Sequence, residues 1–335
     1  MDRCLAMPFV MSMDGKAAGM THREKRQTGK SEATAQIKSY ERYGNDLLII
    51  EYGLHTFGME LGAQMADPED AVPHIIKNPL DNIDDWESMD WDMILPQNSK
   101  LFKKHMEAVK ICISEVGQEV PLGVLAGMPF TQIASILGTE KLLKAVRRNP
   151  ETVHAMMRRC TDLMKEVHTA YIAEGAMCLL CEPIGTGSII PQKTFHEFIE
   201  PYMTEIIDNI KDKNGMCCYH ICGNSTPIWG NMVASGPHMI SVDNVVDLSA
   251  AKKAVEPYMP IVGAVDTVDV MVLGSREDVH EEVKKSIRQG YDAAHGYILA
   301  SGCDLNVNVP MENVDYFMEA ARKYVKMPID HATWE

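Results

Sequence analysis

Three residues of this 335-residue chain, His220, Cys222 and Cys303, have side chains that could together bind a transition metal. His220 and Cys222 are two residues apart, so on a β-strand both side chains lie on one face, about 6.6 Å apart along the backbone. An imidazole nitrogen and two thiolate sulfurs suit Zn²⁺ better than Mg²⁺ or Ca²⁺. Three protein ligands leave a fourth position for water or substrate, which is typical of a catalytic zinc site.

The spacing alone also allows a simpler interpretation, because a free cysteine is often only a small buried hydrophobic residue. Cys178 and Cys181 are three residues apart, so a strand directs them to opposite faces, and we expect both to pack in the core. Cys218 shares the face of His220 and Cys222, and we expect it to line the interior more deeply.

Short β-rich segments alternate with longer amphipathic segments along most of the chain. Eight segments are predicted as strands, at residues 5–10, 46–51, 121–126, 177–181, 216–221, 239–242, 260–265 and 297–300. Helices are predicted at residues 30–43, 100–116, 150–174, 191–213, 226–234, 249–256, 275–289 and 310–323. Strands separated by helices imply parallel pairing and right-handed crossover connections.

Eight such units predict an α/β fold with one domain over residues 1–335, a closed (β/α)₈ barrel of the TIM type. An open, doubly wound sheet is the alternative, although no G-x-G-x-x-G motif follows any predicted strand. Residues 52–99 do not fit the repeat, and we predict that they form an excursion between the second and third strands.

The predicted barrel positions the candidate ligands, because active sites of this fold lie at the C-terminal ends of the strands. His220 and Cys222 close the fifth predicted strand, Cys303 follows the eighth, and Glu182 closes the fourth. We therefore expect these four side chains on one rim. Glu182 is predicted either as a fourth metal ligand that leaves when substrate arrives or as a catalytic residue that contacts the substrate.

Two further acidic residues on the same rim are candidate catalytic residues. Asp243 follows the sixth predicted strand and Asp266 follows the seventh. Each could orient the substrate or a zinc-bound group, and each is equally compatible with capping an ordinary loop.

The composition argues against several classes of partner. A net charge of −15 argues against nucleic acid or an anionic membrane. No run of 18 apolar residues predicts a transmembrane helix, and residues 1–10 lack the apolar core of a signal peptide. Nine cysteines, an odd number, favour free or metal-bound thiols over a disulfide framework, so we expect a cytoplasmic protein.

The motif around the candidate ligands resembles a known family. Residues 220–224 read His-Ile-Cys-Gly-Asn, and Gly302-Cys303 follows far downstream. Together they resemble the uroporphyrinogen decarboxylase-like superfamily, and within it the zinc-dependent corrinoid methyltransferase branch, which includes methylcobamide:coenzyme M methyltransferases. The resemblance extends over residues 40–324, with supporting segments at residues 40–46, 182–184, 190–192, 262–265 and 310–314.

This resemblance implies a (β/α)₈ barrel in which His220, Cys222 and Cys303 bind zinc. It implies a transferase that moves a methyl group between a small substrate and the cobalt of a corrinoid. The substrate would be a thiol or an O-methyl donor such as a methoxylated aromatic or methanol. The chain has no D-x-H-x-x-G corrinoid-binding motif, so the cobalamin is expected on a separate corrinoid carrier protein.

Two other functions stay open from the sequence. One is a uroporphyrinogen decarboxylase-like enzyme without zinc, and the other is a non-catalytic barrel that acts as a binding protein. Decarboxylases of the family carry an arginine-containing R-Q-A-G-R-type loop after the first strand, whereas residues 11–16 read Met-Ser-Met-Asp-Gly-Lys here. The resemblance therefore favours methyl transfer over decarboxylation of a polyacidic tetrapyrrole.

Overall fold

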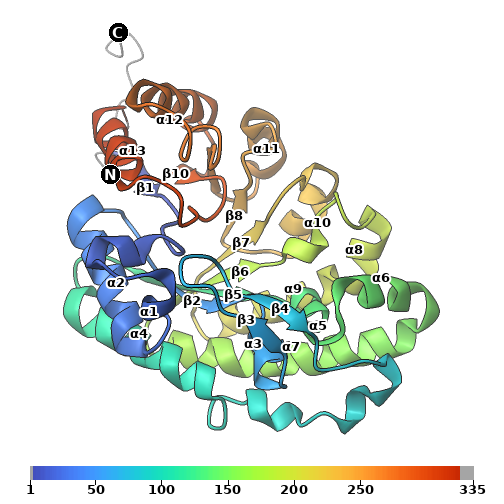
Figure 1. The fold of residues 1–335 in the computed structure, drawn as a ribbon. Coiled ribbons are helices and arrows are strands. Elements are labelled where there is room, and N and C mark those ends of the chain that lie inside the picture. The colour runs from blue at the N-terminus through green and yellow to red at the C-terminus, as the bar shows by residue number, and fades with distance from the viewer. Residues whose placement is uncertain (1–2, 325–335) are drawn as a thin grey trace.

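The computed structural model describes residues 3–324 of the chain. Eight parallel strands form one sheet in the order β1-β10-β9-β8-β7-β6-β5-β2 (Figure 1). The strands are β1 (Leu5–Met7), β2 (Leu48–Gly53), β5 (Leu122–Gly127), β6 (Met177–Cys181), β7 (Cys217–Ile221), β8 (Met239–Val242), β9 (Ile261–Val265) and β10 (Tyr297–Ser301). Each of them overlaps a predicted segment.

The sheet follows chain order around a ring, which identifies a barrel and excludes the doubly wound alternative. The order runs from β2 through β5 to β10 and then to β1, whereas a doubly wound sheet reverses direction midway. Asp46 bridges the seam between β1 and β2, because its N–H donates to the Ala6 carbonyl oxygen at 3.0 Å. Its carboxylate also accepts from the Ala6 N–H at 2.7 Å. The predicted (β/α)₈ barrel is therefore confirmed.

Helices surround the strands. They are α1 (His22–Lys25), α2 (Gly29–Tyr43), α3 (Thr56–Glu60), α4 (Lys100–Val116), α5 (Pro129–Leu137), α6 (Thr139–Arg148), α7 (Pro150–Ala173), α8 (Gln192–Phe198), α9 (Glu200–Asp212), α10 (Trp229–Ala234), α11 (Leu248–Val255), α12 (Arg276–Gly290) and α13 (Met311–Tyr324). The helix predicted over 191–213 is divided into α8 and α9, because Pro201 in the first turn of α9 cannot continue the hydrogen bonds of α8. Within residues 3–324, no helix is both long and apolar enough to cross a membrane.

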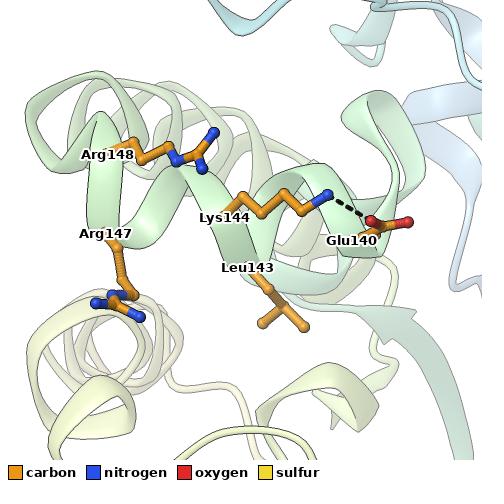
Figure 2. Close-up of a pocket in the computed structure, with 5 residues that line it drawn as sticks. All are labelled: Glu140, Leu143, Lys144, Arg147 and Arg148. Carbon is orange, nitrogen blue, oxygen red and sulfur yellow. Dashed lines mark hydrogen bonds and ion pairs between the residues drawn. The ribbon is translucent and has the colours of Figure 1, made fainter.

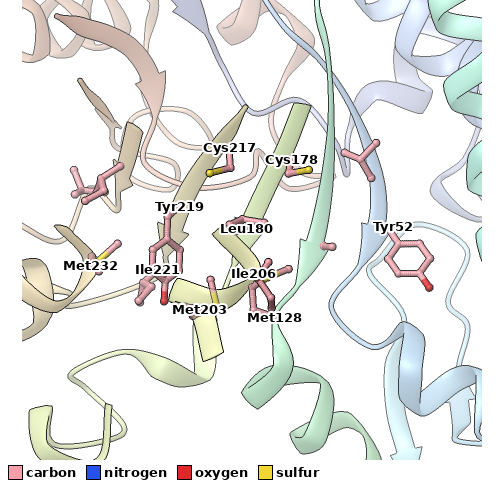
Figure 3. Close-up of a cluster of buried hydrophobic side chains, with 14 of the residues drawn as sticks. Tyr52, Met128, Cys178, Leu180, Met203, Ile206, Cys217, Tyr219, Ile221 and Met232 are labelled. Carbon is pink, nitrogen blue, oxygen red and sulfur yellow. The ribbon is translucent and has the colours of Figure 1, made fainter. Parts of the chain in front are cut away.

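Successive side chains of each strand point to opposite faces, so the sheet has two hydrophobic cores. The outer core lies between the strands and the surrounding helices, and the inner core lies inside the barrel. Cys178 and Leu180 of β6 and Tyr219 of β7 belong to the outer core, which they share with Met203, Ile206 and Met232 of the surrounding helices (Figure 3). Leu179 and Cys218 belong to the inner core, together with Met7, Ile49, Val262 and Ala300. Cys218 therefore lines the barrel interior as predicted, and residues 220 and 222 continue the same face toward the mouth.

Residues 52–99, the predicted excursion, form small elements between β2 and β5. They are α3, an antiparallel hairpin of β3 (Gln64–Ala66) and β4 (His74–Lys77), and the 3₁₀ helices η2 (Ile83–Ser88) and η3 (Trp91–Ile94). The turn of the hairpin brings Val72 to the barrel mouth, where it lines the same cavity as Cys222 and Cys303. This segment therefore contributes to the candidate site.

Candidate metal centre

His220, Cys222 and Cys303 converge at the C-terminal mouth of the barrel. His220 and Cys222 come from the end of β7, and Cys303 comes from the loop that follows β10. Cys222 Sγ lies 3.3 Å from His220 Nε2 and 3.6 Å from Cys303 Sγ. The structure thus brings together the three ligands predicted from the sequence.

These separations agree with those that a tetrahedral zinc ion imposes on its ligands. Zn–S bonds of about 2.3 Å and Zn–N bonds of about 2.0 Å place two sulfurs about 3.8 Å apart, and a sulfur and a nitrogen about 3.5 Å apart. The observed distances are 3.6 Å between sulfurs and 3.3 Å between sulfur and nitrogen. The donor set therefore fits Zn²⁺ in both chemistry and spacing.

A fourth donor, Cys181, joins this cluster from the end of β6. The ligand atoms of Cys181, His220 and Cys222 all lie within 4.8 Å of one another. Both cysteines are buried as expected, but Cys178 lies in the outer core, whereas Cys181 lines the cavity at the cluster. Alternation explains the difference, because Cys181 shares the face of Leu179, which points into the barrel.

Glu182 is not brought to this cluster, because it follows Cys181 and lies on the opposite, outer side. Its buried carboxylate accepts hydrogen bonds from the Phe130 N–H at 3.1 Å and from the Thr131 hydroxyl, both in the first turn of α5. Burial raises the pKa of Glu182 to about 8. The carboxyl group of Glu182 thus contacts the N-terminus of α5, and Cys181 lies where the sequence predicted Glu182 as the fourth ligand.

Asp243 and Asp266 hold the loops beside the cluster. Asp243 Oδ2 accepts a hydrogen bond at 2.7 Å from the N–H of Gly223, the residue directly after Cys222. Asp266 Oδ2 accepts one at 2.9 Å from the side-chain amide of Asn244. Both predicted acidic residues therefore lie close to the metal centre, with carboxylates engaged in loop contacts.

The glycine before Cys303 is required by a close approach between two loops. A Cβ atom at Gly302 would lie 2.4 Å from the backbone nitrogen of Asn244. Gly302 also donates its N–H to the Val265 carbonyl oxygen at 2.8 Å, which continues the β9–β10 pairing beyond the strands. Because Asp266 holds Asn244, it acts on the position of Cys303 through this contact.

Hydrogen bonds orient the donors and set their protonation. His220 Nδ1 lies 3.0 Å from Ser241 Oγ, which leaves Nε2 facing Cys222, and such a partner fixes the ring of a metal-binding histidine. A hydrogen bond with Cys181 and burial raise the pKa of Cys222, and a hydrogen bond with Cys222 and burial raise the pKa of Cys303. A bound divalent cation would oppose these shifts, because it favours the thiolate form.

A cavity of about 220 Å³ opens onto the cluster. The inward-facing side chains of β5 and β6 make it largely apolar, and its described lining contains the carboxylates of Glu51 and Asp304 but no lysine or arginine. Asp304 is engaged, because its carboxylate accepts from the N–H groups of Met11 at 3.1 Å and Ser12 at 3.2 Å. Burial raises the pKa of Asp304 to about 7.

A second depression, of about 480 Å³, lies on α6 (Figure 2). Its lining consists of Glu140, Leu143, Lys144, Arg147 and Arg148. Lys144 forms an ion pair with Glu140 at 2.5 Å, one turn earlier on the helix. This lining contains no metal-binding cysteine or histidine and shares no residue with the cavity at the cluster, so we place the candidate site at the barrel mouth.

The model of the family described as "Uroporphyrinogen decarboxylase (URO-D)" matches residues 5–324. The chain belongs to the uroporphyrinogen decarboxylase family. This family member is 28% identical over 254 residues to the methylcobamide:CoM methyltransferase MtbA of Methanosarcina acetivorans, covering 75% of this chain and 72% of that protein. It is 24% identical over 299 residues to the uroporphyrinogen decarboxylase of Wigglesworthia glossinidia brevipalpis, covering 84% and 76%.

A solved methyltransferase from Methanosarcina mazei superposes on this family member with a TM-score of 0.87. The sequence identity is 19%, and the match covers 97% of this chain and 95% of that one. The comparison shows that the two proteins share their fold.

Two residues of the metal centre in this family member were missed from the sequence. The sequence did indicate the position of Cys181, because residues two apart on a strand share a face and Leu179 lies on the inner face. No sequence feature indicated Ser241, because its contact with His220 depends on the register between β7 and β8. That register is not readable from local sequence.

Proposed function

We propose that this protein is a zinc-dependent methyltransferase that moves a methyl group between a small substrate and the cobalt of a corrinoid held by a separate carrier protein. The substrate is a thiol or an O-methyl donor such as a methoxylated aromatic or methanol. The observation that carries the proposal is the convergence of His220, Cys222 and Cys303 at separations suited to zinc. Cys181 is the proposed fourth donor, which gives way to the substrate.

The relatives support a methyltransferase. Besides the protein from Methanosarcina acetivorans, the methylcobamide:CoM methyltransferase MtbA of Methanosarcina mazei is 29% identical over 255 residues. The cavity supports the same choice over a decarboxylase, because its described lining offers two carboxylates and no lysine or arginine. A polyacidic tetrapyrrole would meet like charges there and no counter-charge.

The chemistry requires a sulfur or oxygen that carries negative charge while the methyl group is transferred. Zinc at this site would supply a Lewis acid that favours the anionic form of that atom near neutral pH. Ser241 orients the His220 ring, and Asp243 fixes the turn after Cys222. Leu125 and Leu179 line the cavity and exclude water, which strengthens the electrostatic interactions inside it.

The methyl transfer itself exchanges one bond for another. When a thiol is methylated, its sulfur forms a bond to the methyl carbon, and the cobalt–carbon bond breaks with its electron pair left on cobalt. When a methyl donor is demethylated, cobalt(I) forms the bond to carbon, and the sulfur or oxygen keeps the electron pair. Both directions use the same contacts around the substrate atom.

The barrel mouth supplies a surface on which the carrier can dock. Exposed apolar side chains gather on segments at the C-terminal ends of the strands, and we name these residues the mouth surface: Val72, Ile76, Ile189, Val245, Val268 and Leu273. Leu273 is 72% exposed and Val245 is 64% exposed. These segments lie on the side of the barrel from which a corrinoid has to reach the substrate, so a carrier that docks there would cover these apolar side chains.

Metal analysis of the purified full-length protein tests the proposal. We expect about one equivalent of zinc in the wild type and large losses in Cys222→Ala and Cys303→Ala. Cys160→Ala is the matched control, because this cysteine is buried in the outer core and lies outside the cluster. Less than about half an equivalent in the wild type, unchanged in the two variants, would contradict a zinc enzyme and favour a decarboxylase-like or non-catalytic barrel.

A further inference from the structure

Glu51 carries a carboxylate into the cavity at the metal centre. It follows Leu47 and Ile49 on the inner face of β2. In the sheet register it pairs with Leu125 of β5, which in turn pairs with Leu179 of β6, and all three side chains line the cavity. Glu51 is half-buried, and a carboxylate beside apolar side chains is stabilised when a counter-charge or a hydrogen-bond donor reaches it.

A β-bulge follows Glu51 directly. The register with β5 shifts between Glu51 and Gly53, so Tyr52 is an extra residue on β2. Tyr52 is buried against the rings of Phe102 and His105, with centroid distances of 6.3 and 5.8 Å. Bulges bend a strand and are over-represented beside active sites, where they redirect a side chain.

No side chain in residues 3–324 forms a hydrogen bond or an ion pair with the Glu51 carboxylate. Lys25 and Lys104 line the neighbouring cavity together with Glu51 and interact with it electrostatically, but each ammonium has a closer partner. The Lys25 ammonium forms an ion pair with Asp14 at 2.9 Å, and the Lys104 ammonium donates to the Arg26 carbonyl oxygen at 3.0 Å. Among residues 3–324 the Glu51 carboxylate therefore has no direct hydrogen-bond or ion-pair partner, although Lys25, Lys104 and His55 lie within its electrostatic reach.

We propose that Glu51 determines substrate specificity by binding a cationic group, such as an ammonium, on the substrate whose sulfur or oxygen lies at the metal centre. This inference rests on the proposed methyl transfer and adds the substrate class. A carboxylate in a cavity of about 220 Å³ attracts a small cation and repels an anion. The inference therefore disfavours an anionic thiol as the substrate.

Three thiols that share a two-carbon chain test the inference. They are 2-aminoethanethiol, 2-mercaptoethanol and 2-mercaptoethanesulfonate, with a cationic, a neutral and an anionic head group. Dissociation constants are measured by calorimetry on the zinc-loaded full-length wild type, Glu51→Gln and the control Glu69→Gln. Glu69 is an exposed carboxylate in the turn between β3 and β4 and lies outside the cavity lining.

In the wild type and in Glu69→Gln, we expect the aminothiol to bind at least about tenfold more tightly than mercaptoethanol, and the sulfonate to bind most weakly. Glu51→Gln should remove this preference and leave the affinity for mercaptoethanol within about twofold of the wild type. Equal or tighter binding of the sulfonate, or a uniform effect of Glu51→Gln on all three thiols, would overturn the inference alone. Failure of all three thiols to bind the wild type would overturn this inference for a thiol substrate and would restrict the proposed function to its O-methyl donors.

Discussion

Cys222 Sγ lies 3.6 Å from Cys303 Sγ, although 81 positions of the chain separate the two residues. One is at the end of β7 and the other follows β10, with β8 and β9 between these strands in the sheet. The curvature of the barrel and the contact of Gly302 with Asn244 bring the two sulfurs together. The candidate metal centre is thus a product of the whole fold, and its geometry leads to specific predictions.

The number of sulfur ligands is the first prediction. If Cys181 is the fourth donor, zinc in the resting protein has three sulfur ligands and one nitrogen ligand. Cys181→Ser should lower the sulfur count to two, as measured by X-ray absorption at the zinc edge, with the zinc content kept near one equivalent. Cys178→Ser is the control, because it changes a thiol on the outer face of the same strand. Two sulfurs already in the wild type would contradict a role for Cys181.

Gly302→Ala should displace Cys303. The added methyl group would lie 2.4 Å from the Asn244 backbone, so one of the two loops has to move. We expect a loss of about 1–3 kcal/mol in the free energy of unfolding and weaker zinc binding in competition with a chelator. Gly230→Ala on α10 is the control, because a Cβ there meets no atom within 4 Å. Wild-type zinc affinity in Gly302→Ala would show that this contact does not position the ligand.

Charges on the mouth surface should separate carrier docking from chemistry. In Val245→Asp and Leu273→Asp, we expect the rate with a methylated or reduced corrinoid protein to fall at least about tenfold, because docking would bury a carboxylate. The rate with free cobalamin should stay within about twofold of the wild type, since neither residue lines the cavity. Tyr258→Asp is the control, because this exposed side chain lies at the opposite end of the barrel, before β9. Equal losses with both corrinoids would refute the docking surface.

His168 should make the stability depend on pH. Its ring is fully buried on α7, and neither nitrogen has a hydrogen-bond partner within residues 3–324, so burial lowers the pKa of His168 to about 4. The unfolded chain binds this proton below about pH 6.5 and the folded protein does not, so this contribution to stability is complete above pH 6.5. It is lost progressively as the pH falls toward 4, where the loss reaches about 3 kcal/mol.

Denaturant unfolding at pH 7, 5.5 and 4 checks this prediction. His168→Leu should reduce the decrease in stability between pH 7 and pH 4, and the exposed His295→Leu controls for the loss of one histidine. The same decrease in His168→Leu as in the wild type would assign the pH dependence to other groups.

The strands and the barrel were predictable because each strand is a short apolar run between helical patterns, and because both faces of these strands are buried. Helix α5 was not predicted, since all nine of its residues are buried and leave no amphipathic period to detect. The break between α8 and α9 could have been predicted from Pro201, because proline cannot continue the hydrogen bonds of a helix. The observed ends of helices and strands differ from the predicted ends by a few residues, where capping residues and proline end a segment.

The site was only partly predictable. His220, Cys222 and Cys303 follow from their residue types and their places at strand ends, and the structure brings them together. The sequence predicted Glu182 as the fourth ligand, whereas the structure places Cys181 at the cluster. The choice depends on which face of β6 each residue occupies, and an error of one residue reverses it. Alternation from Ile49 places Glu51 on the inner face, but the bulge that follows it in β2 is not indicated by any local pattern.

The spectrum of cobalamin tests the central claim most directly. The full-length protein is mixed with cob(I)alamin and a panel of methoxyaromatics, methanol, methylamines and methyl thiols, and methylcobalamin formation is followed by absorbance. We predict that at least one donor with a sulfur or oxygen leaving atom yields methylcobalamin, and that Cys303→Ala loses at least about 100-fold in rate. No methylcobalamin from any donor, or an undiminished rate in Cys303→Ala, would contradict methyl transfer at this metal centre.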